Sequence, residues 1–113
     1  MYTIPIQTNG WATIDRKEHD GKAGTSSWQT MQFDGLCVRI VEYSENYFAD
    51  RWCPKGHIVY CIDGEFASEL ESGETFRLTK GMTYMVSDGQ IFHRFVSVNG
   101  TKLLIIDGDF LKL

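Results

Sequence analysis

The sequence predicts an all-β domain, a sandwich or closed barrel of about ten short strands. Seven Asn-Gly or Asp-Gly pairs punctuate its 113 residues, and each suits a tight hairpin turn because both residue types tolerate positive φ. Short β-branched or aromatic runs lie between the pairs, and no window of ten or more residues keeps a helical apolar period. Closely spaced strands and turns of this kind are typical of sandwiches and barrels. The pairs are Asn9-Gly10, Asp20-Gly21, Asp34-Gly35, Asp63-Gly64, Asp88-Gly89, Asn99-Gly100 and Asp107-Gly108.

The first half of the chain is expected to supply the outer strands. In order, the expected elements are an edge strand at residues 2–7, a short strand at 11–14, a polar loop at 19–27, a hairpin of residues 28–33 and 36–44, a turn at 44–46 and an extended run at 47–53. Pro5 confines residues 2–7 to an edge, because proline cannot donate to a strand ladder. Alternation in the second arm of the hairpin places Cys37, Arg39, Val41 and Tyr43 on one face.

The second half is expected to hold the remaining strands and most of the chemistry. We expect a strand at 58–62, a turn at 63–64, a hairpin from 65 to 78, a strand at 82–86, a turn at 88–89 and a strand at 102–106. The last of these is almost continuously apolar, which indicates burial on both faces or a place in the sheet interior. We interpret residues 1–113 as one domain, with the barrel at about 11–107 and an apolar tail at 108–113.

Composition narrows the classes of partner. The net charge is −4 and the basic residues are scattered, which argues against nucleic acid. No apolar run is long enough for a membrane span and the N-terminus lacks signal-peptide features, so we expect a cytoplasmic protein. The three cysteines, Cys37, Cys53 and Cys61, have no Cys-x-x-Cys spacing and are read as reduced thiols.

The stretch from residue 50 to residue 95 resembles the cupin family. His57 and the apolar strand that ends at Gly64 are similar to the first cupin motif, and Gly81, Gly89 and His93 are similar to the second. More closely, the chain resembles the small group called DHCW-motif cupin fold proteins. The matching residues are Ala49-Asp50, Trp52-Cys53, Lys55-Gly56-His57, residues 38–44, Gly81-Met82-Thr83-Tyr84, Asp88-Gly89 and His93-Arg94. The resemblance covers about residues 11–107 and implies a cupin-type β-barrel, the double-stranded β-helix or jelly roll, but it assigns no chemistry.

Four potential metal ligands gather in this stretch. Asp50, Cys53, His57 and His93 offer a carboxylate, a thiolate and two imidazoles, which bind divalent transition metals such as zinc, iron, nickel or manganese. His57 and His93 stand at the mouths of two short strands and are the pair expected to converge, with Asp50 or Cys53 assisting. The alternative interpretation is that both histidines are hydrogen-bonded to backbone and that Cys53 is a small core residue.

One residue departs from the DHCW pattern, because Arg51 stands where the name of the group implies a histidine. A guanidinium is not a metal ligand. Arg51, Arg39 and Arg94 instead suit an anionic ligand, or they pair with surface acids such as Glu42.

Aromatic side chains are expected to line or fill the barrel. The candidates for a ligand pocket are Trp52, Tyr60, Tyr84 and Phe95, together with Arg39 and Arg51. A small barrel either packs such side chains as core or keeps one apolar pocket with a few polar groups.

Three functional hypotheses follow from these residues. The first is a small-molecule site at the barrel mouth that uses a divalent metal; an enzyme of this kind would be oxygenase-like or isomerase-like, and no catalytic base stands out. The alternative is a metal-free module that binds or senses a small ligand. A third is a purely structural dimeric role. The apolar tail and the expected edge strand also predict a homodimer.

Overall fold

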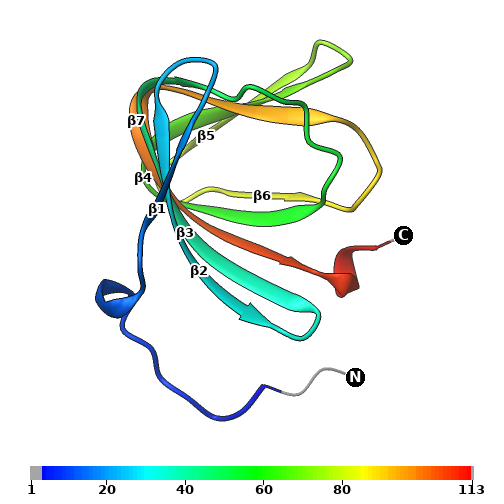
Figure 1. Cartoon of the computed structure of the whole chain (residues 1–113). Coiled ribbons are helices and arrows are strands. Elements are labelled where there is room, and N and C mark those ends of the chain that lie inside the picture. The colour runs from blue at the N-terminus through cyan, green and yellow to red at the C-terminus, as the bar shows by residue number, and fades with distance from the viewer. Residues whose placement is uncertain (1–3, 113) are drawn as a thin grey trace.

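Seven antiparallel strands form one strongly bent sheet in a computed structural model, which describes residues 4–112 (Figure 1). The elements are η1 (Trp11–Thr13), β1 (Lys17–Asp20), β2 (Thr25–Phe33), β3 (Leu36–Phe48), β4 (His57–Leu70), β5 (Thr75–Thr79), β6 (Thr83–Val86), β7 (His93–Gly108) and η2 (Asp109–Leu111). The strand order is β1-β2-β3-β7-β4-β5, and β6 pairs with the first part of β4. The predicted all-β fold is confirmed, with fewer and longer strands than the ten expected.

Strand bending accounts for most of the difference in strand number. β4 and β7 continue through Asp63-Gly64 and Asn99-Gly100, two pairs that the sequence analysis assigned to turns. Gly64 has φ 76° and Gly100 φ 86°, and a Cβ on Gly64 would lie 2.3 Å from the Gly100 carbonyl oxygen. The register between β4 and β7 shifts at this level. These glycines therefore bend the paired strands instead of reversing them. β4 and β7 stay paired on both sides of the bend.

Other expected boundaries in the first half were wrong. β3 runs through the expected turn at 44–46, where Asn46 adopts φ 55° within the strand. The expected loop at 19–27 contains the end of β1 and the start of β2, which pair as a hairpin. The hairpin of residues 28–33 and 36–44 is confirmed by the β2 and β3 register.

The N-terminal segment does not form the two strands expected of it. Residues 4–7 are exposed and belong to no strand, and residues 2–3 lie outside the described residues. Residues 11–13 form the 3-10 helix η1, because the backbone N–H and the hydroxyl of Thr13 both donate to the Gly10 carbonyl. The Gln29 side-chain amide donates to the carbonyls of Trp11 and Ile14 and so holds this segment against β2.

The core lies inside the bent sheet and follows the alternation of the strands. Its buried members are Val41, Tyr43, Val59, Cys61, Phe66, Leu78, Phe95, Leu103 and Ile105. β7 lies between β3 and β4, in agreement with the expected interior place of residues 102–106. Neither short helix within residues 4–112 is long and apolar enough to cross a membrane.

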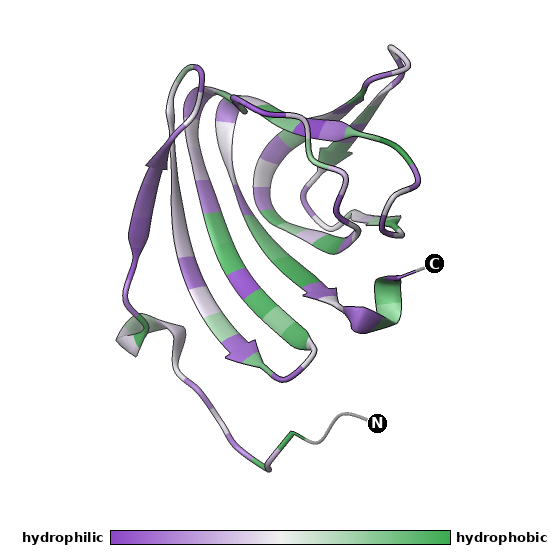
Figure 2. Ribbon diagram, turned by 45° about the vertical axis from the view of Figure 1, so that its right-hand side comes forward, coloured by the Kyte–Doolittle hydropathy of each residue, from purple (hydrophilic) through white to green (hydrophobic). Residues whose placement is uncertain are grey.

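One row of side chains on the outer face of the sheet is also apolar. The strand register aligns five apolar side chains in one row across β2, β3, β7, β4 and β6: Met31, Val38, Ile106, Ile58 and Met85. Figure 2 shows hydrophobic stretches on neighbouring strands of this sheet. We call these five residues the outer row; Met85, at its end, is 70% exposed.

Candidate metal centre

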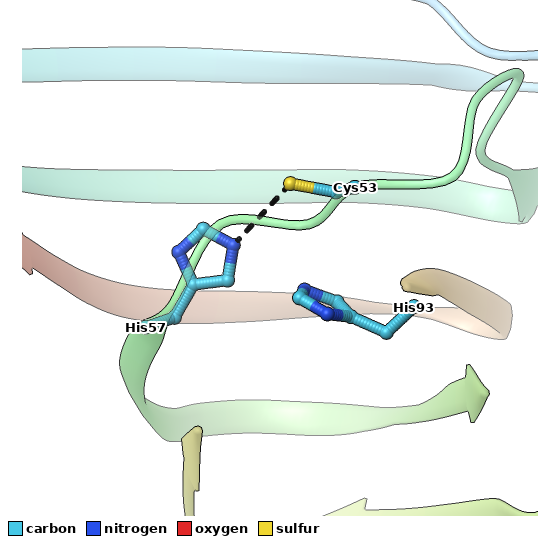
Figure 3. A group of neighbouring side chains, drawn as sticks. All are labelled: Cys53, His57 and His93. Atoms are coloured by element: carbon cyan, nitrogen blue, oxygen red, sulfur yellow. Dashed lines mark hydrogen bonds between the residues drawn. The ribbon is translucent and has the colours of Figure 1, made fainter. Parts of the chain in front are cut away.

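Cys53, His57 and His93 bring their donor atoms within 4.8 Å of one another inside the barrel (Figure 3). His57 is the first residue of β4, His93 is the first residue of β7, and Cys53 lies in the loop that leads to β4. Cys53 and His93 form an antiparallel backbone bridge, with N···O distances of 2.7 and 3.0 Å. This bridge fastens the Cys53 loop to the start of β7 and sets the two side chains next to each other.

His57 is oriented by an acid that the sequence analysis did not assign to the site. Its Nδ1–H donates to Asp107, since a carboxylate only accepts, and its Nε2 faces the Cys53 Sγ at 3.9 Å. Asp107 is 1% exposed and also pairs with Arg39, whose guanidinium lies over the Trp28 ring. A carboxylate behind a histidine ring is the arrangement that fixes metal-binding imidazoles in one tautomer.

The charges at the centre follow from these contacts. Burial by itself would lower the pKa of His57, but hydrogen bonds with Asp107 and Cys53 outweigh it and raise the pKa to about 9. Burial would raise the pKa of the Cys53 thiol, but the hydrogen bond with His57 and the Lys55 backbone bring it below its usual value. Burial likewise opposes ionisation of Asp107, yet His57 and then Arg39 hold its pKa below the usual range. A metal ion would take the place of the His57 Nε2 proton.

His93 is the least satisfied polar side chain of the core. It is 2% exposed, and neither ring nitrogen has a hydrogen-bond partner among residues 4–112. Burial and then the charge on His57 lower the pKa of His93; the nearby Ile91 backbone opposes this without forming a good hydrogen bond. Nearly all buried polar atoms in folded proteins are paired. A neutral, unpaired imidazole that faces a histidine and a cysteine is therefore the arrangement expected of a metal ligand.

The donor set fits a transition metal in chemistry, and one of its donor–donor distances is close to that of two coordinated ligands. Tetrahedral coordination with metal–ligand distances of about 2.0–2.3 Å places neighbouring donor atoms roughly 3.4–3.6 Å apart. The Cys53 Sγ to His57 Nε2 distance of 3.9 Å is close to this value. Two imidazoles and a thiolate suit zinc, iron, nickel or copper better than magnesium or calcium. Three protein donors also leave a coordination position for another ligand.

A cavity of about 200 Å³ adjoins the three donors. It is lined by Trp28, Arg39, Tyr43, Tyr47, Ala49, Asp50, Arg51, Cys53, His57, His93, Arg94, Phe95 and Ile105. Asp50 and Arg51 are exposed and so form its rim. The group of donor atoms that converge within the described chain does not include Asp50, although its side chain lines the same cavity.

The other aromatic candidates lie outside the cavity lining. Trp52 is 37% exposed and stacks on Arg94. The Tyr84 ring packs at the edge of Phe95, and its hydroxyl accepts a hydrogen bond from Ser68. Tyr60 is 43% exposed on the outer face, because it alternates with two buried residues of β4.

Asp107 was missed because Asp107-Gly108 was read as a turn pair. The signal that would have identified it is the period of β7. Leu103 and Ile105 are buried inside the barrel, so the next inward position of the strand is Asp107. A carboxylate that continues a buried apolar face needs a partner, and here it has Arg39 and His57.

Comparison with known proteins supports the fold. Neither a family model nor a curated protein matches the sequence. Solved structures do match: the polyketide cyclase RemF from Streptomyces resistomycificus is 15% identical with a TM-score of 0.77, over 91% of this chain and 79% of that chain. An RmlC-like cupin from Shewanella frigidimarina is 15% identical with a TM-score of 0.68, over 95% and 92%. Fe(II)-HppE, solved with the alternative substrate (S)-1-HPP, is 10% identical with a TM-score of 0.75, over 91% and 60%.

At these identities the likeness concerns architecture alone. The architecture is that of the cupin-type β-barrel, the jelly roll that the sequence predicted. The chain thus shares its fold with cupin-type proteins and holds a possible metal site of Cys53, His57 and His93 within that fold.

Proposed function

We propose that this chain binds a small molecule at the mouth of the barrel through a divalent transition metal held by Cys53, His57 and His93. The observation that carries the proposal is His93, which is buried with neither ring nitrogen partnered by any residue that the structure describes. The similar fold of Fe(II)-HppE, which was solved with iron and a substrate, is in keeping with this reading. Zinc, iron and nickel are the candidate metals, since manganese, the fourth metal considered from the sequence, prefers oxygen donors.

When bound, the metal supplies Lewis acidity or, in the case of iron, a redox centre, as oxygenase-like or isomerase-like chemistry requires. The residues of the chain prepare its site. Asp107 holds the His57 Nδ1–H and leaves Nε2 directed at the other donors, while Arg39 holds Asp107. Aromatic side chains form part of the cavity wall beside the donors.

Elemental analysis of protein purified without an affinity tag or chelator tests this proposal. We expect close to one metal ion per chain in the wild type and little or none in the His93→Ala and Cys53→Ser variants. The His19→Ala variant is the matched control, since His19 is an exposed histidine of β1. A wild type that carries no metal and takes up none when zinc or iron is added would contradict the proposal.

A metal-free module that binds or senses a small ligand is the second candidate. It is favoured by the Arg39, Asp107 and His57 contacts, which are complete without a metal ion. In that case the histidines contribute hydrogen bonds instead of coordination. A melting temperature that a chelator leaves unchanged, but that an organic ligand raises, would favour this candidate.

We also propose that the protein is a cytoplasmic homodimer related to the DHCW-motif cupins. The outer row supports the dimer, because five apolar side chains about 4.8 Å apart span roughly 19 Å of sheet. A second copy of the same face would cover it by twofold symmetry. Light scattering at micromolar concentration is expected to give twice the chain mass, and Met85→Lys is expected to shift it toward the monomer. A monomeric wild type would overturn the dimer.

A further inference from the structure

We infer that Arg51 binds a carboxylate group of the ligand, so that the site takes a small organic anion with a flat apolar body. The inference rests on the proposed small-molecule site and assigns its ligand class.

The first observation is that Arg51 differs from the other arginines of the chain. Four of the five arginines pair with a carboxylate: Arg16 with Glu42, Arg39 with Asp107, Arg77 with Glu65 and Arg94 with Glu69. Among residues 4–112, Arg51 has no such partner, although it lines the cavity beside the metal centre. A guanidinium that stays unpaired at a cavity rim has all its donors available to a ligand.

The second observation is that the other two arginines of the cavity are already held. The guanidinium of Arg39 pairs with the buried Asp107 and lies over an aromatic ring. Arg94 pairs with Glu69 and lies 4.4 Å from the ring centroid of Phe48 and 4.2 Å from that of Trp52. Neither guanidinium is free to turn toward a ligand without losing these contacts, which leaves Arg51 for that role.

The third observation is that Arg51 lies on a loop fastened on both sides. The Ala49 N–H donates to the Phe95 carbonyl at 3.2 Å, and Cys53 makes its two backbone bonds with His93. The backbone of Arg51 is therefore placed before a ligand arrives, which lowers the entropic cost of binding. Of the three arginines in the cavity lining, Arg39 and Arg94 already have acidic partners, so Arg51 is the one left to attract an anion.

The cavity walls define the body of the ligand. Tyr43 and Tyr47 stack with their ring centroids 4.2 Å apart and their planes at 7°, and Trp28 and Phe95 line the same space. The volume of about 200 Å³ is below the roughly 300–1,000 Å³ of drug-sized sites. A small aromatic or unsaturated carboxylate matches these walls, with its charged group at the rim.

Calorimetric titration with matched pairs of probes tests the inference. The pairs are acetate and acetamide, benzoate and benzamide, and phenylacetate and phenylacetamide, each titrated into zinc-treated and chelator-treated protein. We expect at least one carboxylate to bind the wild type at least tenfold more tightly than its amide. Arg51→Gln is expected to abolish that preference. Arg51→Lys should keep part of it, because an ammonium supplies charge without the planar fork. Arg77→Gln, a remote arginine of β5, is the control and should match the wild type.

Metal content measured on the same samples separates this inference from the proposed function. If the wild type holds metal but no carboxylate is preferred, or if Arg51→Gln keeps the full preference, the inference is overturned and the metal centre stands. If the preference exists and depends on Arg51 in protein that takes up no metal, the metal centre fails and the anion site stands.

Discussion

Replacing His93 with phenylalanine tests the metal centre in both of its states. In the metal-free wild type, the two ring nitrogens of His93 are buried without partners in the described part of the chain. A buried polar group left unpaired costs about 1–3 kcal/mol. Phenylalanine removes both nitrogens and keeps a planar ring, and the adjoining cavity of about 200 Å³ has room for the added ring atoms. We therefore expect the free energy of unfolding of the metal-free protein to rise by about 1–3 kcal/mol.

The same substitution removes one of the three proposed metal ligands, so the effect on stability should reverse when zinc is present. Zinc at one hundred times its dissociation constant stabilises the wild type by about 2.7 kcal/mol and leaves the variant unchanged. Urea unfolding in EDTA and again with zinc measures both effects. His19→Phe, at an exposed position, controls for the added ring. The reasoning is refuted if the variant is less stable than the wild type in EDTA, or if zinc stabilises both proteins equally.

Three further predictions follow from the contacts of the centre. Asp107→Asn should lower the free energy of unfolding by about 3 kcal/mol, because Arg39 and His57 lose their buried carboxylate partner. It should also weaken zinc binding 10–100-fold. Urea unfolding and zinc titrations that match the wild type would contradict this prediction. The pKa of His57 is about 9 in the folded metal-free protein and about 6.5 when unfolded, so its stabilising contribution is complete below pH 6.5 and is lost as the pH rises through 9. Urea unfolding of a Cys53→Ser variant removes the opposing titration of the thiol and should show a reduced part of this loss between those pH values, because Cys53 supplies some of the increase in the pKa of His57 and Asp107 the rest; constant stability would count against the contact of His57 with Asp107. Gly56→Ala should destabilise the fold by about 1–3 kcal/mol, since its Cβ would lie 2.6 Å from a backbone oxygen of β6, whereas Gly10→Ala meets nothing within 4 Å and should be neutral in thermal melts.

Local patterns in the sequence predicted the fold class but not the lengths of the strands. The hairpin across Asp34-Gly35 was predictable because the runs on both sides alternate and the pair between them suits a two-residue turn. The pairs Asp63-Gly64 and Asn99-Gly100 have the same local preference, yet they bend strands. A residue pair that tolerates positive φ serves a turn or a bulge equally well, and only pairing between β4 and β7 decides between them.

Sequence patterns likewise predicted the two histidines of the candidate site, but not the contacts that complete it. His57 and His93 were expected to converge because each precedes a strand beside a glycine-containing loop, and their rings lie 5.3 Å apart between centroids. The approach of Cys53 depends on its backbone bridge with His93, a contact between residues forty positions apart that local spacing does not report. Asp107 was hidden for a different reason, since its pairing with glycine suggested a turn.

The place of β7 in the sheet has a consequence for the synthesis of the protein. β7 lies between β3 and β4 but follows both in the chain. Until residues 93–108 leave the ribosome, each of these long strands has a hydrogen-bonding edge without its neighbour, and such edges invite aggregation. Contacts this distant in sequence also form slowly. Closure of the barrel and arrival of Asp107 beside His57 are thus one late event, and a nascent chain that stalls before it carries the candidate ligands Cys53 and His57 without the acid that orients the His57 ring.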